Sequence, residues 1–266
     1  LRRQRQMCIR DSPDILGLYH DFWGDDQITL NTILRQSCPG EARDLINREH
    51  DFGFNKFSII RRCNLIIEQA SASTALSDLD KKELVAEGKM LRAMIYYYQA
   101  KHCGRVIWVD RVLQVDDEFN LPLTESIDRT YDLILSDLDD AIAGLPEEYP
   151  AGRANANAAR ALKSEVCLTA AAYTTDATRK KTLWEQAVVA VDAIQGYSLD
   201  ANYGGMFNQE NSYSSTEIIL ARYFSKENTN GGDTYMQTVI PNQGNDNLKK
   251  LGPVSYTHLT LPTKRI

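Results

Sequence analysis

The feature that most constrains this chain is a series of helix-period apolar patterns that fills its middle part. Apolar residues recur every three or four positions in five segments, at 52–70, 78–102, 126–144, 156–174 and 180–195. Alanines in the fourth segment allow neighbouring helices to approach closely. We therefore expect antiparallel helices in tetratricopeptide-like pairs, 52–70 with 78–102 and 126–144 with 156–174, although the strict repeat signature of that motif is missing.

Local signals indicate where these helices start and stop. Ser126 is expected to cap the third helix, and Gly144 is expected to end it. The second helix is expected to be capped by Asp78 or Asp80, and the fourth to begin near Asn155 or Asn157. In the fifth helix, the stripe expected to face the core is Trp184, Ala187, Val188, Val191 and Ile194.

Beyond Tyr203 the helical pattern fades. Gly, Asn and Ser dominate residues 202–215 and 226–247, and only residues 217–223 (EIILARY) have the character of a strand. The expected fold class is therefore mainly α, with tetratricopeptide-like helical pairs and a loop-rich, partly β C-terminal portion.

The two ends of the chain can be read as the two strands of one DNA segment. One choice of codons for residues 2–12 (RRQRQMCIRDS) gives a string whose reverse complement encodes residues 254–263 (VSYTHLTLPT). This resembles a sequencing adapter, and segments of such origin are set aside before fold reasoning. We therefore interpret residues 1–12 and 254–266 as adapter-derived, and residues 13–253 as one domain truncated at both ends.

This interpretation changes the charge balance. The whole chain has 30 Lys and Arg residues against 36 Asp and Glu, a net charge of −6. The two end segments hold six of those basic residues and one of the acidic ones, so residues 13–253 carry a net charge of −11. An acidic segment without a basic run argues against nucleic acid as a partner.

No residue pattern points to catalysis, a metal or a cofactor. The cysteines of residues 13–253 form no CxxC pair and have no His at metal-ligand spacing. Motifs of the GxSxG, HExxH and glycine-rich phosphate-loop types are absent. Paired carboxylates such as Asp139 and Asp140 diverge on a helix, whereas a glycosidase needs two that converge on one cleft. We expect a protein that is not an enzyme.

Four polar residues within or beside the helices are expected to be structural. Asn64 lies on an apolar helix face, where a buried amide bonds a neighbouring loop or helix end. Glu87 and Arg92 are expected to anchor helix pairs through charge-assisted hydrogen bonds, and Arg153 to fix a loop to a helix end.

Aromatic residues outside the helical stripes are the candidates for sugar binding. An aromatic face stacks on the apolar face of a pyranose, while polar side chains bond its hydroxyls, and binding residues concentrate on loops. The six ligand-binding candidates are Trp23, Asp25, Asp26, Trp108, Tyr203 and Tyr213. For each aromatic residue, packing inside the protein remains the alternative.

Five sequence blocks, taken in order, carry a family resemblance. They are residues 54–69 (FNKFSIIRRCNLIIEQ), 84–100 (LVAEGKMLRAMIYYYQA), 129–146 (RTYDLILSDLDDAIAGLP), 152–168 (GRANANAARALKSEVCL) and 196–220 (GYSLDANYGGMFNQENSYSSTEIIL). Together they resemble the SusD/RagB family, glycan-binding outer-membrane lipoproteins of Bacteroidetes. Residues 102–109 (HCGRVIWV) depart from it by lacking the proline of the family's turn, and Gly88 stands where the family prefers Ala.

The resemblance implies a protein that binds an oligosaccharide or similar nutrient without cleaving it. It implies delivery to a TonB-dependent SusC-like transporter, and a surface-exposed position at the cell outer membrane through a lipid anchor. We expect that anchor and its signal peptide to lie outside this fragment, and no site residue carries over from the family. Two alternatives remain: a soluble tetratricopeptide-type adaptor that binds peptides in a concave polar groove, and an α-helical carbohydrate-active enzyme.

Overall fold

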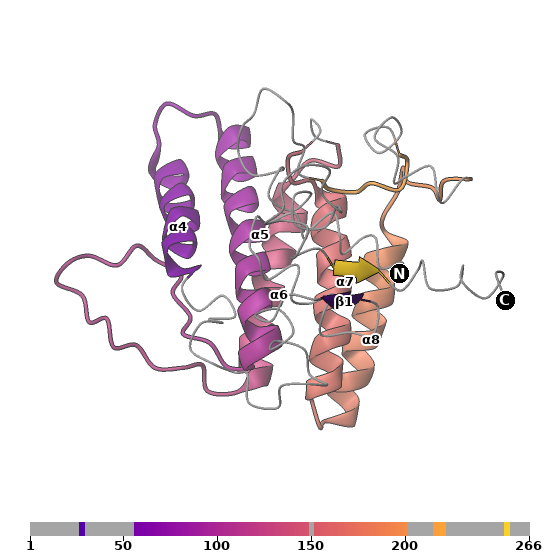
Figure 1. Cartoon of the computed structure of the whole chain (residues 1–266). Helices are drawn as coiled ribbons and strands as arrows, with labels where there is room; N and C mark the ends of the chain where they lie inside the picture. Colours follow the sequence, from indigo (N-terminus) through magenta and orange to yellow (C-terminus); the bar gives the residue numbers. More distant parts are fainter. Residues whose placement is uncertain (1–26, 30–55, 149–151, 202–214, 222–252, 256–266) are drawn as a thin grey trace, which may run out of the picture. The chain divides into compact units, whose positions relative to one another are not determined.

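The computed structural model describes residues 27–29, 56–148, 152–201, 215–221 and 253–255, here called the described residues (Figure 1). Their elements are β1 (Gln27–Thr29), α4 (Phe57–Ala72), α5 (Asp78–Cys103), α6 (Ile127–Gly144), α7 (Ala156–Tyr173), α8 (Ala177–Asp192) and β2 (Pro253–Ser255). All the described helices lie in one compact unit, Asp51–Ala221. The two strands lie in the other unit, where β1 pairs antiparallel with β2 and Ile28 is opposite Val254.

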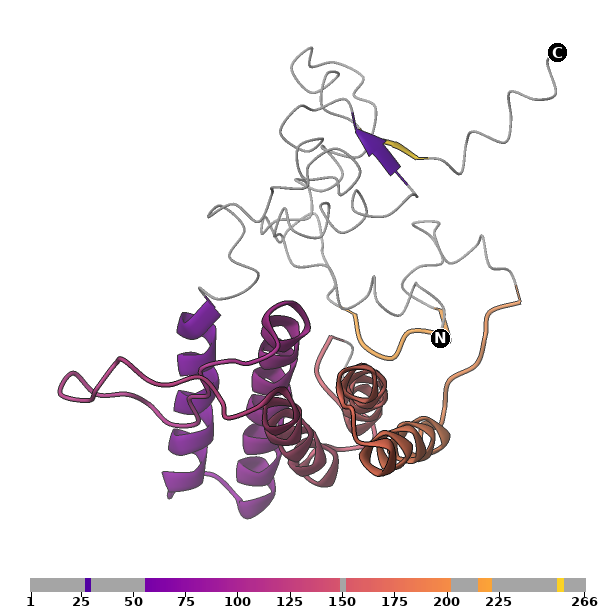
Figure 2. The ribbon, with the colours of Figure 1, turned by 90° about the horizontal axis from the view of Figure 1, so that it is seen from below.

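The helices form a row in which each one packs against the next along the chain (Figures 1 and 2). Successive helices run in opposite directions from α4 to α8. α5 also contacts α7, so these two helices lie on the same side of the row. The predicted pairs α4–α5 and α6–α7 are in contact, but α5 packs on α6 and α7 on α8 as closely. The mainly α prediction is confirmed, and the pairs merge into one continuous array.

Side chains at the helix starts explain most of the boundaries. Ser126 and Asn155 cap α6 and α7, as predicted. The prediction for α5 is wrong, because Ser77 is its cap. The Ser77 hydroxyl accepts the Asp80 N–H at 3.1 Å and donates to the Asp80 carboxylate at 2.7 Å. Asp80 therefore lies three residues after the cap and bonds it, and the helix begins at Asp78, where the expected segment begins.

The core runs between α5, α6 and α7. Among its fully buried side chains are Tyr96, Tyr131, Ile134, Leu138 and Val166. Fully burying a side chain of this size stabilises the fold by roughly 1.5–3 kcal/mol. A second cluster joins α5 and α6 to the alanines at the start of α7, and Ile219 and Leu220 pack against it. Residues 215–221 are thereby held on the helical array.

Two glycines let the helices approach closely. A Cβ on Gly88 would lie 2.9 Å from Ile67 Cγ1 of α4, and a Cβ on Gly144 would lie 2.5 Å from Ala86 Cβ of α5. Glycine in a helix costs about 1 kcal/mol relative to alanine. At these positions that cost is offset by close helix packing, which a side chain would prevent. This packing explains why a glycine stands at position 88.

The predicted stripe of α8 is wrong in part. Ala187 is buried as expected, but Trp184 and Val188 are more than half exposed, and Leu183 and Ala190 are buried instead. The helix also starts at Ala177, three residues before the expected position. α8 packs mainly against α7, so its buried stripe is narrow, and one face is left uncovered by its neighbour.

The predicted strand at 217–223 is wrong for the residues that are described. Residues 215–221 form turns and bends, and residues 222 and 223 lie outside the described residues. The Ser215 hydroxyl accepts the N–H of Glu217, and the Glu217 carboxylate accepts the N–H of Asp200 at 2.9 Å. These side-chain bonds satisfy backbone groups locally, in place of a strand ladder.

None of the described helices combines the length and the apolar character that crossing a membrane requires.

Candidate functional site

Trp108 is the one ligand-binding candidate that the structure describes. Trp23, Asp25, Asp26, Tyr203 and Tyr213 lie outside the described residues. The Trp108 ring stacks on Tyr96, with ring centroids 4.2 Å apart and planes at 24°. The Arg92 guanidinium carbon lies 5.7 Å from the centroid of the indole. The half-buried ring is therefore used in packing on at least one face, and its role toward a ligand stays a prediction.

A buried polar cluster holds the segment that carries Trp108. Arg92 of α5 donates to both carboxylate oxygens of Asp137 of α6, at 2.7 and 2.8 Å. It also donates to Asn64 Oδ1 at 2.8 Å and to the carbonyl of Asp110 at 3.1 Å. The Asn64 amide donates in turn to the carbonyls of Val109 and Arg111, each at 3.0 Å. The predicted structural roles of Asn64 and Arg92 are confirmed.

Two further side chains fix the same segment through its backbone N–H groups. Tyr96 Oη accepts the Val109 N–H, and Glu68 Oε1 accepts the Val112 N–H, each at 2.7 Å. Burial raises the pKa of Tyr96 well above its ordinary value, so this hydroxyl stays protonated. The segment that carries Trp108 is therefore fixed to α4 and α5.

The cluster carries a charge pair in a nearly dry environment. Burial by itself lowers the pKa of Arg92, but the hydrogen bonds and the charge of Asp137 outweigh it and raise that pKa. Burial raises the pKa of the neighbouring Cys63 thiol to about 11. A thiol that is buried and protonated is a poor nucleophile, so Cys63 is a packing residue.

Glu87 and Arg153 are structural, as expected, but they pair with each other, so Glu87 holds a loop in place of a second helix, and Arg153 reaches the body of α5 in place of a helix end. Arg153 pairs with Glu87, which fixes the segment before α7 to α5. At the other end of α5, Gly104 adopts φ +75° and its N–H bonds the Ala100 carbonyl at 2.8 Å. A glycine with positive φ therefore ends α5 at this point.

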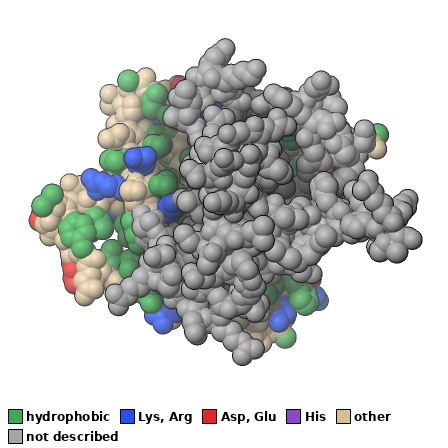
Figure 3. All heavy atoms as spheres, viewed as in Figure 1, with side chains coloured by type: hydrophobic (Ala, Val, Ile, Leu, Met, Phe, Trp, Pro, Cys, Tyr) green, Lys and Arg blue, Asp and Glu red, His purple; other side chains and the backbone are tan. Residues whose placement is uncertain are grey.

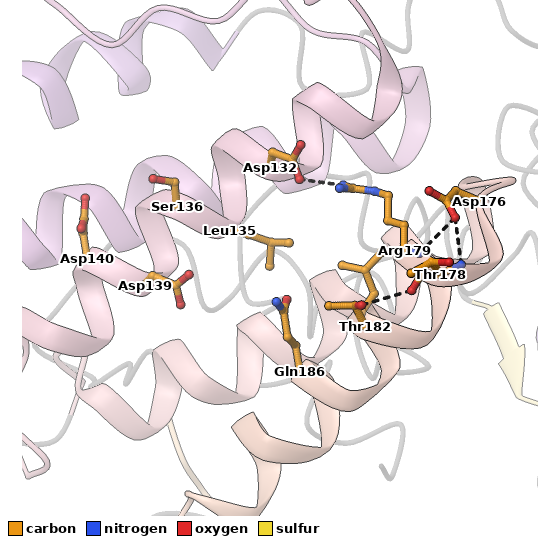
Figure 4. Close-up of a pocket in the computed structure, with 11 residues that line it drawn as sticks. Asp132, Leu135, Ser136, Asp139, Asp140, Asp176, Thr178, Arg179, Thr182 and Gln186 are labelled. Carbon is orange, nitrogen blue, oxygen red and sulfur yellow. Dashed lines mark hydrogen bonds and ion pairs between the residues drawn. The ribbon is translucent and has the colours of Figure 1, made fainter.

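A groove of about 580 Å³ lies between α6 and α8 (Figure 4). Its lining residues are Asp132, Leu135, Ser136, Asp139, Asp140, Asp176, Thr178, Arg179, Thr182, Leu183 and Gln186. On α6 these positions share one face because they are three or four residues apart. The lining combines hydroxyls and carboxylates with one guanidinium, and no lining residue is aromatic, so the groove offers hydrogen bonds without a ring for stacking on a sugar.

The charged groups of the groove already serve the packing of the helices. Arg179 of α8 donates to Asp132 of α6 at 2.7 Å (Figure 4). Asp139 pairs with Lys163 of α7, and Asp140 pairs with Lys89 of α5, each at 2.5 Å. These ion pairs link α6 to each of its neighbours, and the neighbouring carboxylates Asp139 and Asp140 go to different helices.

Phe119 is an exposed loop aromatic that the list of ligand-binding candidates does not include. Phe119 lies in the segment between α5 and α6 (residues 104–126, the α5–α6 loop) and is 66% exposed. It lies outside every helical stripe and is flanked by Glu118 and Asn120. The same criterion that selected Trp108 would have selected Phe119, and Phe119 is the more accessible of the two.

The chain was compared with known proteins. A family model described as "Starch-binding associating with outer membrane" matches residues 47–168, which include α4, α5 and α6. A SusD-like protein of Bacteroides ovatus is 26% identical over 172 residues, which are 63% of this chain and 31% of that protein. The chain spans about a third of the length of the curated relatives it matches.

Solved structures share the fold. The crystal structure of a SusD-like protein from Bacteroides fragilis matches with a TM-score of 0.66 and 27% identity, over 83% of this chain and 43% of that one. A laminarin-binding SusD-like protein matches with a TM-score of 0.55 and 24% identity, over 66% of this chain and 37% of that one. In its sequence and in its array of antiparallel helices, the helical part of this chain is similar to SusD-like proteins.

Proposed function

We propose that the full-length protein holds an oligosaccharide or similar nutrient at the outer surface of the outer membrane. It passes this nutrient, uncleaved, to a TonB-dependent SusC-like transporter, and a lipid anchor keeps it at the membrane. The observation that carries the proposal is the match of residues 47–168 to a family described as starch-binding and associated with the outer membrane. The fold shared with a laminarin-binding relative supports the same ligand class.

The helical array supports this function as a scaffold. Binding residues are often carried by loops on a rigid framework, and the Arg92 cluster fixes one long loop to α4 and α5. We propose that the sugar contacts come from loops, with Trp23, Asp25, Asp26, Tyr203 and Tyr213 as candidates and Trp108 as a supporting residue.

A non-catalytic role is part of the proposal. A glycosidase needs two carboxyls facing one sugar-sized cleft. In the groove between α6 and α8, Asp139 and Asp140 are engaged with lysines of two different helices. These contacts support a role in packing for this carboxylate pair.

A peptide-binding adaptor is the second candidate, and one observation favours it. The groove between α6 and α8 is lined mostly by polar side chains, as a peptide site of this kind requires. In that case the Thr182 hydroxyl and the Gln186 amide would bond the peptide backbone.

One screen separates the candidates. The purified full-length protein is applied to a glycan array and to a peptide array, and the products are analysed for shortened glycans. Binding to a glycan that is recovered intact supports the proposal. Peptide binding that disappears in Thr182→Val/Gln186→Leu, without glycan binding, supports the adaptor. Hydrolysis of a glycan would refute both.

A further inference from the structure

Apolar side chains occupy two adjoining stripes along α8, and only one of these stripes is buried. Leu183 and Ala187 belong to the buried stripe, and each is 3% exposed. Trp184, Val188 and Val191 form the second stripe, because residues three and four positions apart share one side of a helix. Trp184 is 51% exposed, Val188 is 59% exposed and Val191 is half-buried. A continuous apolar stripe that includes a tryptophan marks a candidate contact surface, whereas single exposed apolar residues are common.

The second stripe lies on the last described helix of the row. α5, α6 and α7 each pack against the helix before and the helix after them along the chain, whereas α8 packs mainly against α7 (Figure 2). In Figure 3, green apolar side chains reach the surface at the lower edge, right of centre, where Figure 1 places the lower ends of α7 and α8. The last element of a helical array needs a polar outer side to stay soluble. α8 instead carries a tryptophan and valines there, which is the composition of an inner helix.

The geometry and charge of the second stripe indicate what covers it. Side chains about one turn apart form a ridge, and such a ridge packs into the groove of a neighbouring helix. Lys181 and Glu185, which lie beside the stripe, pair with each other at 3.8 Å, so their charges are matched within α8. The three stripe residues carry no charge and no polar group besides the indole N–H of Trp184. Their complement is the apolar side of another helix.

The part of the full-length protein outside this chain is the source of that helix. The chain spans about a third of the length of its curated relatives, so the full-length protein has enough chain to supply one. From α4 to α8, each helix packs against the next one along the chain, so the covering helix is expected to follow α8. Residues 226–247 are dominated by Gly, Asn and Ser and lack a helical apolar period. The covering helix is therefore expected beyond residue 253.

We propose that a helix from the part of the full-length protein that follows residue 253 packs on Trp184, Val188 and Val191 and continues the array beyond α8. The proposal concerns the scaffold, so it does not depend on which nutrient the protein binds. A second copy of the protein and a glycan stacked on Trp184 are the other possible occupants, and the experiments distinguish them.

The first test is hydroxyl-radical labelling of the full-length protein without glycan, at a concentration where light scattering shows a monomer. The labelling rate of Trp184 is divided by its rate in the urea-unfolded protein, and the same ratio is measured for Tyr131, which is fully buried. We expect Trp184 to lose as much of its labelling as Tyr131 does. A Trp184 that keeps about half of its unfolded rate, in proportion to its exposed area, overturns the proposal.

Two adjacent valines give a matched pair of variants. Val188 belongs to the stripe, whereas Val189 is 68% exposed and lies about 100° further around the helix. Val188→Ser is expected to lower the urea midpoint of the full-length protein by about 0.5–1 M, because it places a hydroxyl in an apolar contact. Val189→Ser is expected to leave the midpoint unchanged. Equal midpoints for the two variants overturn the proposal.

A cross-link identifies the covering segment. p-Benzoylphenylalanine in place of Lys181 lies beside the stripe, and its photoproducts in the full-length protein are mapped by mass spectrometry. We expect a product that joins α8 to a peptide beyond residue 253. Products that join two copies, or that are confined to residues 1–253, overturn the proposal. Protection of Trp184 that appears only after glycan is added assigns the stripe to the glycan and overturns the proposal as well.

Discussion

Replacing Arg92 by leucine tests how the α5–α6 loop is held. The side chains of Arg92 and Asp137 are 6% and 7% exposed, so both charges are almost out of solvent. Arg92→Leu leaves the Asp137 carboxylate buried without its partner and removes the donors to Asn64 Oδ1 and the Asp110 carbonyl. Breaking a buried ion pair by removing one partner costs about 3–5 kcal/mol. That is a large share of the roughly 5–15 kcal/mol that stabilises a native protein.

A second substitution separates the ion pair from the loop. Arg92→Leu/Asp137→Leu removes both charges, and replacing a whole buried pair by apolar residues is often neutral. We expect it to recover most of the global stability but not the loop contacts, because Asn64 Oδ1 and the Asp110 carbonyl still lack a donor. Arg111→Leu is the matched control, since it breaks a two-bond pair to Asp117 at an exposed site and is expected to have a much smaller effect.

The assay combines urea unfolding of the full-length protein with hydrogen exchange at the amides of Val109 and Val112. Arg92→Leu should lower the unfolding midpoint and speed exchange at both amides. The double variant should restore the midpoint while exchange at these amides stays fast. A midpoint for Arg92→Leu equal to that of Arg111→Leu would refute the reasoning, because the buried pair would then be worth no more than an exposed one.

Three further predictions follow from single contacts. Gly144→Ala places a methyl 2.5 Å from Ala86 Cβ, so overpacking of about 1–3 kcal/mol should outweigh the gain of about 1 kcal/mol in helix propensity, and a higher urea midpoint would contradict this. The Tyr131 hydroxyl is buried and finds no hydrogen-bond partner among the described residues, so Tyr131→Phe should leave the free energy of unfolding unchanged or raise it by about 1 kcal/mol, and a clear loss would reveal a missing partner. Hydrogen bonds from Arg111 lower the pKa of Asp117 to about 2, below its ordinary value of 3.8. The contribution of Asp117 to stability is therefore present above about pH 4 and is lost as the pH falls toward 2. In an NMR titration, the pKa of the Asp117 carboxyl should be higher in Arg111→Leu than in wild type.

The helix boundaries could be predicted where their signals are local. Ser126 and Asn155 cap their helices through bonds to residues three positions later, so a few letters of sequence suffice. Asn64 was also predictable as a buried amide, because an amide on an apolar face must find hydrogen bonds. Its actual partners, two carbonyls 45 and 47 residues away, could not be named from the sequence.

The sequence is least informative where packing decides. Trp184 fits a helical stripe, but which stripe of α8 is buried depends on how that helix lies against α7. Trp108 is a loop aromatic for which the sequence leaves both ligand binding and packing open, and only the fold shows that Tyr96 stacks on its ring. Gly88 looked like a cost to its helix until the nearness of Ile67 explained it. In each case the deciding neighbour lies on another element of the fold.

The most direct test of the account is an equilibrium titration of the full-length protein with the glycan chosen by the array, followed by recovery of that glycan. We expect saturable heat of binding and a recovered glycan of unchanged chain length. The absence of saturable binding to every glycan tested, or recovery of shortened products, would contradict the proposal that this protein captures a nutrient without cleaving it.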